Sequence, residues 1–140
     1  IERAGKADIV FVAAAGNDGE DGDVIPHYPA SYDSASILSV AAIGAGGAMA
    51  SFSNYGKVSV DLGAPGVAIN STLPDKGYGL LSGTSMAAPH VAGAIALYAS
   101  SHPEVRKAED LKKAIMDAAV PTTSLAGKTV TGGRLDVSGF

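Results

Sequence analysis

Uninterrupted apolar runs, rather than alternating ones, mark the first half of the chain. The runs Ile9–Ala14 and Ser36–Ile43 contain several β-branched residues and no charged residue. Such runs are typical of strands that are buried on both faces of a parallel sheet. Further short strands are predicted on both sides of a turn at Ala64-Pro65-Gly66 and near the end of the chain: Val58–Leu62, Val67–Thr72, Gly77–Leu81 and Val130–Val137.

Two helices are predicted in the second half of the chain. Thr84–Ser101 contains no Asp, Glu, Lys or Arg and is apolar on nearly all sides, which predicts a helix buried within a core. Glu104–Ala119 is amphipathic, and its residues Glu109 and Lys113 have the spacing and order of a favourable surface ion pair. Strands that alternate with buried helices predict an α/β protein with a parallel sheet.

Composition bounds the size and the class of the protein. With 140 residues, of which 46% are hydrophobic and 17% charged, the chain is one domain with a real core, and a disordered chain is excluded. A net charge of −4 argues against a nucleic-acid binder, and the absence of cysteine excludes disulfides and a thiol nucleophile. The apolar runs are too short to span a bilayer, so no membrane partner is expected.

The start of the chain has neither an initiator Met nor a pattern typical of a signal peptide. Ile1–Asp8 is typical of the last turns of a helix that ends at Gly5-Lys6-Ala7-Asp8. From these two features we expect the chain to be a piece of a longer protein.

The segment Ser82–Gly93 carries the clearest chemistry. It places Ser85 at the predicted N-terminus of the apolar helix, where free backbone N–H groups and the helix dipole stabilise a negatively charged oxygen. A nucleophilic serine needs this environment because its attack creates an oxyanion. The alternative is that Thr84 or Ser85 serves only as the N-cap of the helix.

This segment closely resembles the nucleophile signature of the subtilisin-like serine peptidases (subtilases), Gly-Thr-Ser-Met-Ala-x-Pro-His-Val-Ala-Gly. Phe11–Gly19 resembles the oxyanion-hole block of the same family, and three further stretches match in the family's order: Tyr28–Tyr32, Ala50–Gly56 and Ala64–Val67. The resemblance covers about residues 4–137. It implies the parallel-sheet, three-layer subtilisin-like fold, with residues 1–140 as the C-terminal part of a single catalytic domain.

By this resemblance Ser85 is the nucleophile of a serine endopeptidase that works through an acyl-enzyme, and the Asn17 side chain holds the oxyanion together with the Ser85 N–H. A neutral amide suits that role because it is a donor that waits for charge to develop. Taken alone, Asn17 is also an ordinary polar turn residue. The resemblance further implies a substrate-binding wall at Ala14-Ala15-Gly16, with His27 near the floor of the main specificity pocket.

The catalytic base is missing from this pattern. No Asp-x-Gly block precedes the oxyanion-hole block as the family's order requires, and no His-Gly-Thr block is present. None of the three histidines, His27, His90 and His102, stands where the family has its base. We therefore expect the chain alone to be inactive. Its expected partners are a peptide or protein substrate and the N-terminal half of the same catalytic domain, which would supply Asp and His. The open alternative is a subtilase-derived structural or binding module without activity.

An acidic loop follows Asn17, with carboxylates at Asp18, Glu20, Asp21 and Asp23. It is either a solvated surface loop or a feature that favours basic substrates or a cation. Subtilases often bind calcium, so the resemblance allows a structural calcium ion, but no metal ligand is predicted and the chemistry requires no cofactor. The resemblance also implies an extracellular or secretory location.

A nucleotide-binding function is not supported. Gly44–Met49 nearly matches the Gly-x-Gly-x-x-Gly motif, but Met49 replaces the last glycine and no helix is predicted after it to receive a phosphate. We predict only a turn at Gly44–Gly47. Ser85 also lies outside the Gly-x-Ser-x-Gly pattern of α/β-hydrolases.

Overall fold

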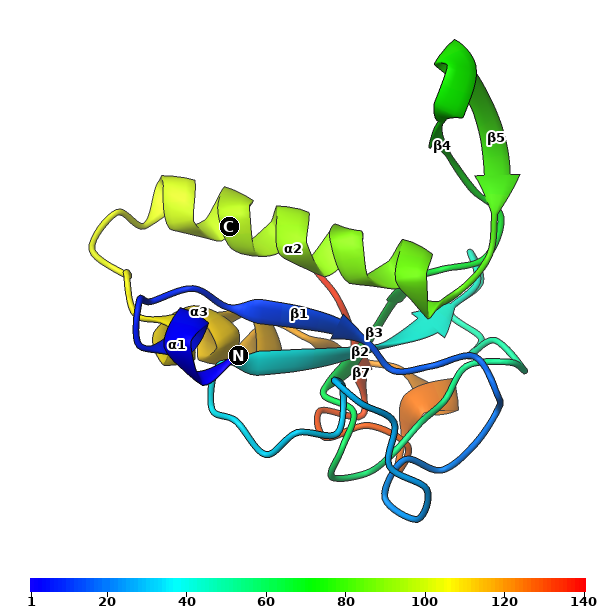
Figure 1. The fold of residues 1–140 in the computed structure, drawn as a ribbon, viewed down its shortest axis with the longest axis horizontal. Coiled ribbons are helices and arrows are strands. Elements are labelled where there is room, and N and C mark those ends of the chain that lie inside the picture. Colours follow the sequence, from blue (N-terminus) through cyan, green and yellow to red (C-terminus); the bar gives the residue numbers. More distant parts are fainter.

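A five-stranded sheet forms the centre of the computed structural model, which describes all residues from 1 to 140 (Figure 1). The strands lie in the spatial order β1-β2-β3-β7-β6, and their bounds are β1 Phe11–Ala14, β2 Ile37–Ile43, β3 Leu62–Pro65, β7 Gly133–Arg134 and β6 Val120–Pro121. Strands β1, β2, β3 and β7 run parallel, and β6 is antiparallel to β7. The predicted α/β class with a mainly parallel sheet is confirmed.

Strand β2 is the central element of the main core. All of its residues are buried, and it pairs with β1 on one side and β3 on the other. Because side chains alternate between the two faces of a strand, Leu38, Val40 and Ala42 share one face. They pack in one cluster with residues of the helices α2 (Thr84–Ser101) and α3 (Ala108–Asp117).

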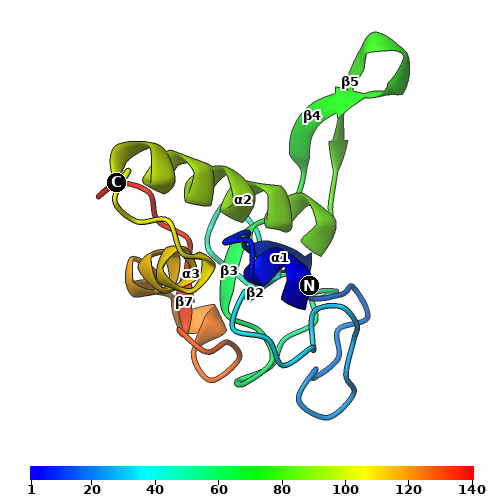
Figure 2. The same ribbon diagram turned by 60° about the vertical axis from the view of Figure 1, so that its left-hand side comes forward.

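The two long helices lie on the same face of the sheet. Helix α2 runs along the strands with α3 beside it (Figures 1 and 2). Helix α3 is amphipathic, and its buried residues Ala108, Leu111 and Ile115 recur at helical spacing. On the opposite face, Ile1, which precedes the short helix α1 (Glu2–Gly5), packs against a small cluster under β1 and β2. The helical layer, the sheet and this thinner layer of α1 and loops agree with the predicted architecture.

Strand β1 lies at the edge of the sheet, which corrects the prediction that Ile9–Ala14 is a strand buried on both faces. The strand begins at Phe11, only Ala13 in it is buried, and Ile9 is 57% exposed. No other strand of the chain pairs with the outer edge of β1. The apolar run therefore has more hydrophobic surface than this chain covers.

Helix α2 has the predicted bounds, but the prediction that it is buried on all sides is wrong. The side that faces the sheet consists of Thr84, Ala87, Val91 and Ala94. The opposite side is exposed, and it includes Pro89, Gly93 and Leu97, of which Leu97 exposes 46% of its surface. The apolar composition therefore includes a face that no other part of the chain covers.

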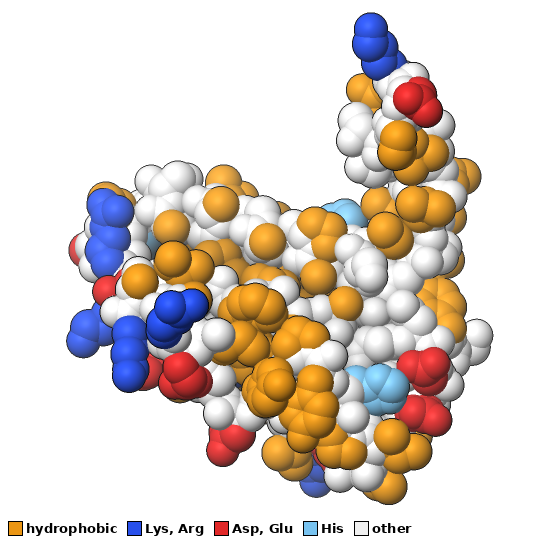
Figure 3. Space-filling view, in the orientation of Figure 1, with side chains coloured by type: hydrophobic (Ala, Val, Ile, Leu, Met, Phe, Trp, Pro, Cys, Tyr) orange, Lys and Arg blue, Asp and Glu red, His pale blue; other side chains and the backbone are white.

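A β-hairpin of β4 (Ile69–Leu73) and β5 (Gly77–Leu81) projects from the body near the start of α2 (Figures 1 and 2). Both strands were predicted, β5 with the same bounds, and a short turn at Pro74–Lys76 joins them. Figure 3 shows hydrophobic side chains gathered along this hairpin. Tyr78 and Leu80 are 74% and 66% exposed.

The loop before β3 differs from the predicted strand Val58–Leu62. The strand begins only at Leu62 and includes Ala64 and Pro65 of the predicted turn, so the chain bends later, at Val67 and Ala68. Residues 57–59 form a turn, and Val58 is 81% exposed. The reason is that the Asp23 carboxylate accepts hydrogen bonds from the N–H groups of Val58 and Ser59, which takes them away from any strand ladder. The turn predicted at Gly44–Gly47 is present.

Regular structure near the C-terminus is shorter than predicted. Helix α3 begins at Ala108 rather than at Glu104, and Lys113 pairs with Asp117 rather than with Glu109. The predicted strand Val130–Val137 is reduced to the two residues of β7. Strand β6, which was not predicted, pairs with it.

Candidate active site

The first turn of α2 presents Ser85 at the surface. Gly83 is the N-cap, and Thr84 and Ser85 are the first two helical residues. Ser85 is exposed and lines a pocket of about 310 Å³ between β4 and α2. The N–H groups of Met86 and Ala87 donate to the Gly83 carbonyl, whereas the Ser85 N–H donates no hydrogen bond within the chain. It is therefore free to meet an anion at the helix N-terminus.

Thr84 connects this turn to the loop after β1. The Asn17 side-chain oxygen Oδ1 accepts from the Thr84 N–H at 2.9 Å and from the Thr84 hydroxyl at 3.0 Å. The same hydroxyl accepts from the Gly16 N–H at 3.2 Å, and Thr84 is fully buried. These donors fix the orientation of the amide, so that Asn17 Nδ2, which donates nowhere within the chain, points away from them. Because neither Thr84 nor Ser85 makes a side-chain cap, the N-cap alternative is wrong.

Asn17 and Ser85 flank the same glycine. A Cβ atom built on Gly83 would lie 3.6 Å from Asn17 Oδ1 and 3.7 Å from the Ser85 nitrogen. The two predicted residues, which are far apart in the sequence, therefore meet where β1 ends and α2 begins, at the sheet edge that parallel α/β proteins use for their sites. Their catalytic roles stay predictions.

The residues predicted to bind substrate adjoin this point. Ala14 ends β1, Ala15 is buried, and Gly16 has a φ of +115°, which favours glycine. A Cβ on Gly16 would lie 3.4 Å from His27 Nδ1. The structure thus brings His27 beside the predicted wall Ala14-Ala15-Gly16, and the role of these residues in substrate binding stays a prediction.

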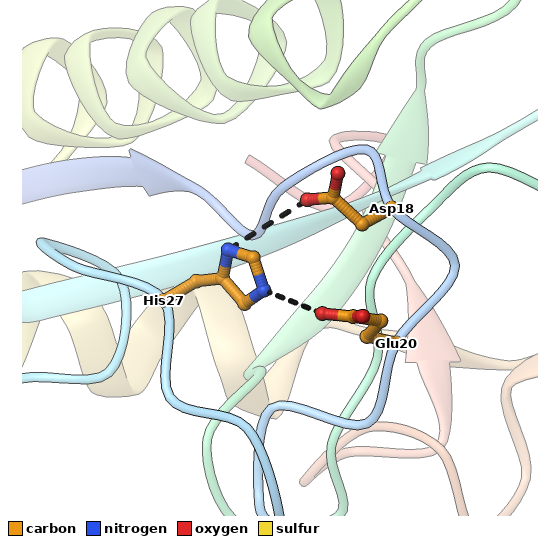
Figure 4. A group of neighbouring side chains, drawn as sticks. All are labelled: Asp18, Glu20 and His27. Atoms are coloured by element: carbon orange, nitrogen blue, oxygen red, sulfur yellow. Dashed lines mark hydrogen bonds and ion pairs between the residues drawn. The ribbon is translucent and has the colours of Figure 1, made fainter.

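His27 lies between two carboxylates of the acidic loop (Figure 4). Its Nε2 is 3.1 Å from Glu20 Oε2, and its Nδ1 is 3.8 Å from Asp18 Oδ2. One ligand atom from each of the three residues lies within 4.8 Å of the others, so this is the group that could hold a metal ion. Because each ring nitrogen faces a different carboxylate, the cluster is arranged as two separate histidine–carboxylate contacts rather than as a closed metal site.

The other two carboxylates of the loop have separate partners. Asp21 Oδ1 accepts from the Asp23 N–H, and the Asp23 carboxylate accepts from Val58 and Ser59. Burial pushes the pKa of Asp23 up, but the Ser59 hydroxyl beside it and the neighbouring backbone N–H groups outweigh burial and hold the pKa below its ordinary value. Calcium takes about six to eight oxygen ligands. Because Asp21 and Asp23 accept from backbone N–H groups and only Asp18 and Glu20 face His27, the four carboxylates do not form such a cage.

None of the three histidines forms a hydrogen bond with Ser85. His27 is paired with its carboxylates, and His90, which lines the same pocket as Ser85, donates from Nδ1 to the Met86 carbonyl at 2.9 Å. His102 follows the far end of α2 and stacks on Tyr98 at 4.0 Å between ring centroids. Ser85 therefore has no histidine of this chain as a hydrogen-bond partner.

Two residues that hold this site were missed by sequence analysis. Thr84 was considered only as a cap, and Asn54 was matched as part of Ala50–Gly56 but given no role. Asn54 is 1% exposed and hydrogen-bonds to three backbone groups of the loop that carries Asn17. Since these partners lie 34 to 39 positions earlier in the chain, no local pattern signals the contact.

Comparison with known proteins gives consistent matches. The model of the Peptidase_S8 family, described as the subtilase family, matches residues 1–136. A subtilisin of Bacillus pumilus is 48% identical over 104 residues, which are 74% of this chain and 37% of that protein. Subtilisin-like protease 2 of Plasmodium falciparum is 36% identical over 133 residues, 93% of this chain and 10% of that protein.

Solved structures extend the likeness to the fold. The self-cleaved protease domain of PatA matches with a TM-score of 0.82 and 32% identity, over 99% of this chain and 51% of that chain. A protease of Pseudoalteromonas arctica PAMC 21717 matches with a TM-score of 0.86 and 27% identity, over 98% and 43%. The chain thus spans about a third of the length of the Bacillus pumilus subtilisin and about half of the solved PatA chain. Because the family model matches residues 1–136 of this chain and solved relatives share its fold, this chain belongs to the subtilase family.

Proposed function

We propose that this chain carries the nucleophile and the oxyanion hole of a serine endopeptidase. The observation that carries the proposal is the exposed Ser85 with its free N–H beside Asn17, whose oxygen is held by Thr84. Ser85 Oγ attacks the peptide carbonyl while a base takes its proton, and the base returns that proton to the leaving amine. The Ser85 N–H and Asn17 Nδ2 donate to the oxyanion. Water then releases the acyl group and restores Ser85.

The base comes, in this proposal, from the N-terminal half of the same catalytic domain, which supplies an Asp and a His. The three histidines of the chain support it, because none of them forms a hydrogen bond with Ser85. The lengths of the relatives also support it, since the chain corresponds to about half of the solved PatA chain. Without that half, the chain has no proton acceptor for Ser85 and is inactive.

Two open surfaces favour such a partner. Strand β1 has a free outer edge, and one more parallel strand there would continue the sheet. The outer side of α2 is exposed and apolar, including Pro89, Gly93 and Leu97, and such a patch is typical of an interface. Both surfaces adjoin the candidate site, because β1 leads to Asn17 and α2 begins beside Ser85.

The substrate, in this proposal, is a peptide or protein chain bound in extended form along Ala14-Ala15-Gly16, with His27 at the floor of the pocket for the side chain before the scissile bond. An extended peptide pairs with exposed backbone next to an edge strand, and side-chain pockets add specificity. The continuity of these residues with β1 and the contact between His27 and Gly16 support this assignment.

We also propose an extracellular or secretory location, which rests on the family resemblance. None of the helices has the length and apolarity that crossing a membrane requires. The proposed steps need only a serine, a base and hydrogen-bond donors, so no cofactor is assigned to the chemistry, and a structural calcium ion stays a prediction for the complete domain. Fractionation of the producing cells, followed by immunodetection of the chain, tests the location.

Fluorophosphonate labelling of the native protein tests the function. Intact mass and peptide mapping are expected to find the label on Ser85 when the N-terminal half is present and no label on the chain alone, and the Ser85→Ala variant serves as the unlabelled control. Asn17→Ala is expected to lower turnover about 10²–10³-fold, the value known for removal of such a donor from a subtilisin. If Ser85 stays unlabelled after the N-terminal half is added, the result contradicts a peptidase and favours an inactive structural or binding module.

A further inference from the structure

The buried residue Asn54 makes four hydrogen bonds to the loop that carries Asn17. Asn54 Oδ1 accepts from the Asp18 N–H at 2.9 Å and from the Glu20 N–H at 3.0 Å. Asn54 Nδ2 donates to the Ala15 carbonyl at 3.2 Å. The Asn54 backbone N–H donates to the Gly16 carbonyl at 2.9 Å. These four bonds bracket Asn17 on both sides and leave its own amide untouched.

The contact between Asn54 and the loop is also tight. A Cβ atom on Gly16 would lie 2.3 Å from Asn54 Nδ2, so only glycine allows this approach. Asn54 itself is fixed to the sheet, because the hydroxyl of its neighbour Ser53 donates to the Asn54 carbonyl and accepts from the Ala42 N–H of β2. Through Ser53 and Asn54, the buried strand β2 therefore fixes the position of the loop.

We propose that Asn54 is a positioning residue of the oxyanion hole, which holds the loop of residues 15–20 so that the Asn17 amide is aimed at the developing oxyanion. This proposal rests on the function proposed for Asn17. Thr84 holds the tip of the Asn17 side chain, through Oδ1, and also contacts the backbone of Gly16 through its hydroxyl. Asn54 holds the backbone from which that side chain starts, and the amide needs both supports to keep its direction.

The expected catalytic effect follows from the loss of the support that Asn54 gives to the loop backbone. Asn54→Ala removes the side-chain partners of the Asp18 and Glu20 N–H groups and of the Ala15 carbonyl, so the backbone at Asn17 can shift. A misplacement of about 1 Å costs up to about 10²-fold in rate. We expect Asn54→Ala to lower kcat about 10- to 100-fold in the assembled peptidase while KM stays within about twofold, because the loss falls on the transition state.

Amide hydrogen exchange of the native protein gives a readout that is independent of activity. The Asp18 and Glu20 amides are expected to exchange about tenfold faster or more in Asn54→Ala, while the amides of α2 are unchanged, since only the local support is lost. Thr129→Val is the control, because Thr129 is buried and its hydroxyl makes no hydrogen bond within the chain. Unchanged exchange at Asp18 and Glu20 would overturn the proposal.

A double-mutant cycle with Asn17→Ala separates positioning from general structure. If Asn54 acts through Asn17, then Asn54→Ala causes no further loss of kcat once Asn17 is alanine, whereas independent effects would multiply. Multiplied losses would overturn the proposal. If Asn54→Ala does not fold, Asn54→Asp serves in the same cycle, because it keeps the acceptor oxygens for the Asp18 and Glu20 N–H groups. An assembled wild-type protein without turnover would refute the proposed function alone, since exchange still decides whether Asn54 holds the loop.

Discussion

The ion pair between Lys112 of α3 and Asp61, the residue before β3, is a sharp test of the energetics of this fold. Lys112 Nζ lies 3.0 Å from Asp61 Oδ1 and donates to the Ile37 carbonyl at 2.6 Å. Asp61 Oδ2 accepts from the Ser39 N–H at 2.7 Å. The side chains are only 19% and 10% exposed. The pair thus joins α3 to two neighbouring parts of the sheet where little water is present.

The magnitude follows from what each substitution leaves behind. Lys112→Met keeps the length and packing of the side chain but leaves the Asp61 carboxylate buried without a cation. Breaking a buried pair in this way costs about 3–5 kcal/mol, and we expect about 2–3 kcal/mol because Asp61 keeps the Ser39 N–H. Asp61→Asn is expected to cost about 1 kcal/mol, since the Lys112 ammonium can extend to water. The double variant should lose about 1–2 kcal/mol less than the sum of both.

Urea unfolding of the wild type, both single variants and the double variant measures this coupling through the midpoints at an unchanged m value. Lys113→Met is the matched control, because its partner Asp117 is 63% exposed and Lys113 is 71% exposed. Exposed pairs contribute little, so this control should lose less than about 0.5 kcal/mol. If the losses of the single variants add up to that of the double variant within about 0.5 kcal/mol, the pair is not coupled and our reasoning is refuted.

Two further predictions concern α2 and the acidic loop. Gly93→Ala should raise the unfolding free energy of the chain by about 0.5–1 kcal/mol, since the added Cβ meets nothing within 4 Å. The same variant should weaken association with the N-terminal half, which titration calorimetry measures. Unchanged association would argue against α2 as the interface. Asp23→Asn should destabilise the chain at neutral pH. Because the folded pKa of Asp23 lies below the ordinary 3.8, its contribution is present above that value and is lost as the pH falls through the folded pKa. The gap in urea midpoints should therefore close in acid, and a gap that stays constant would contradict this.

Local sequence signals located the long elements of the fold but not the short ones. Helix α2 and strand β5 have the predicted bounds because glycine and polar residues delimit their apolar segments. The strand predicted at Val58 failed because a carboxylate far away in the sequence, Asp23, accepts the N–H groups that a strand would use. Strands β6 and β7 have two residues each, which is too short for any periodic pattern to appear.

Local sequence signals were also insufficient for some single residues of the candidate site. Ser85 and Asn17 could be named from their motifs together with the chemistry of a helix N-terminus. Thr84 and Asn54 could not be assigned their contacts, because the bonds that they form to the Asn17 loop span 67 or 68 and 34 to 39 positions. Side-chain hydrogen bonds at such separations have no period, so only the folded chain reveals them.

Both errors in predicted burial overestimate it, and both concern elements that lead to the candidate site. The apolar patterns of Ile9–Ala14 and of α2 predicted burial on all sides, yet Ile9 and Leu97 are about half exposed. The first element leads to Asn17, and α2 carries Ser85 as its second residue. A segment that covered both apolar surfaces would therefore also bring its own side chains to the nucleophile. In our proposal the burial of these faces and the completion of the site are one event, and Gly93→Ala, which adds a methyl group to the interface without touching the site, should weaken both together.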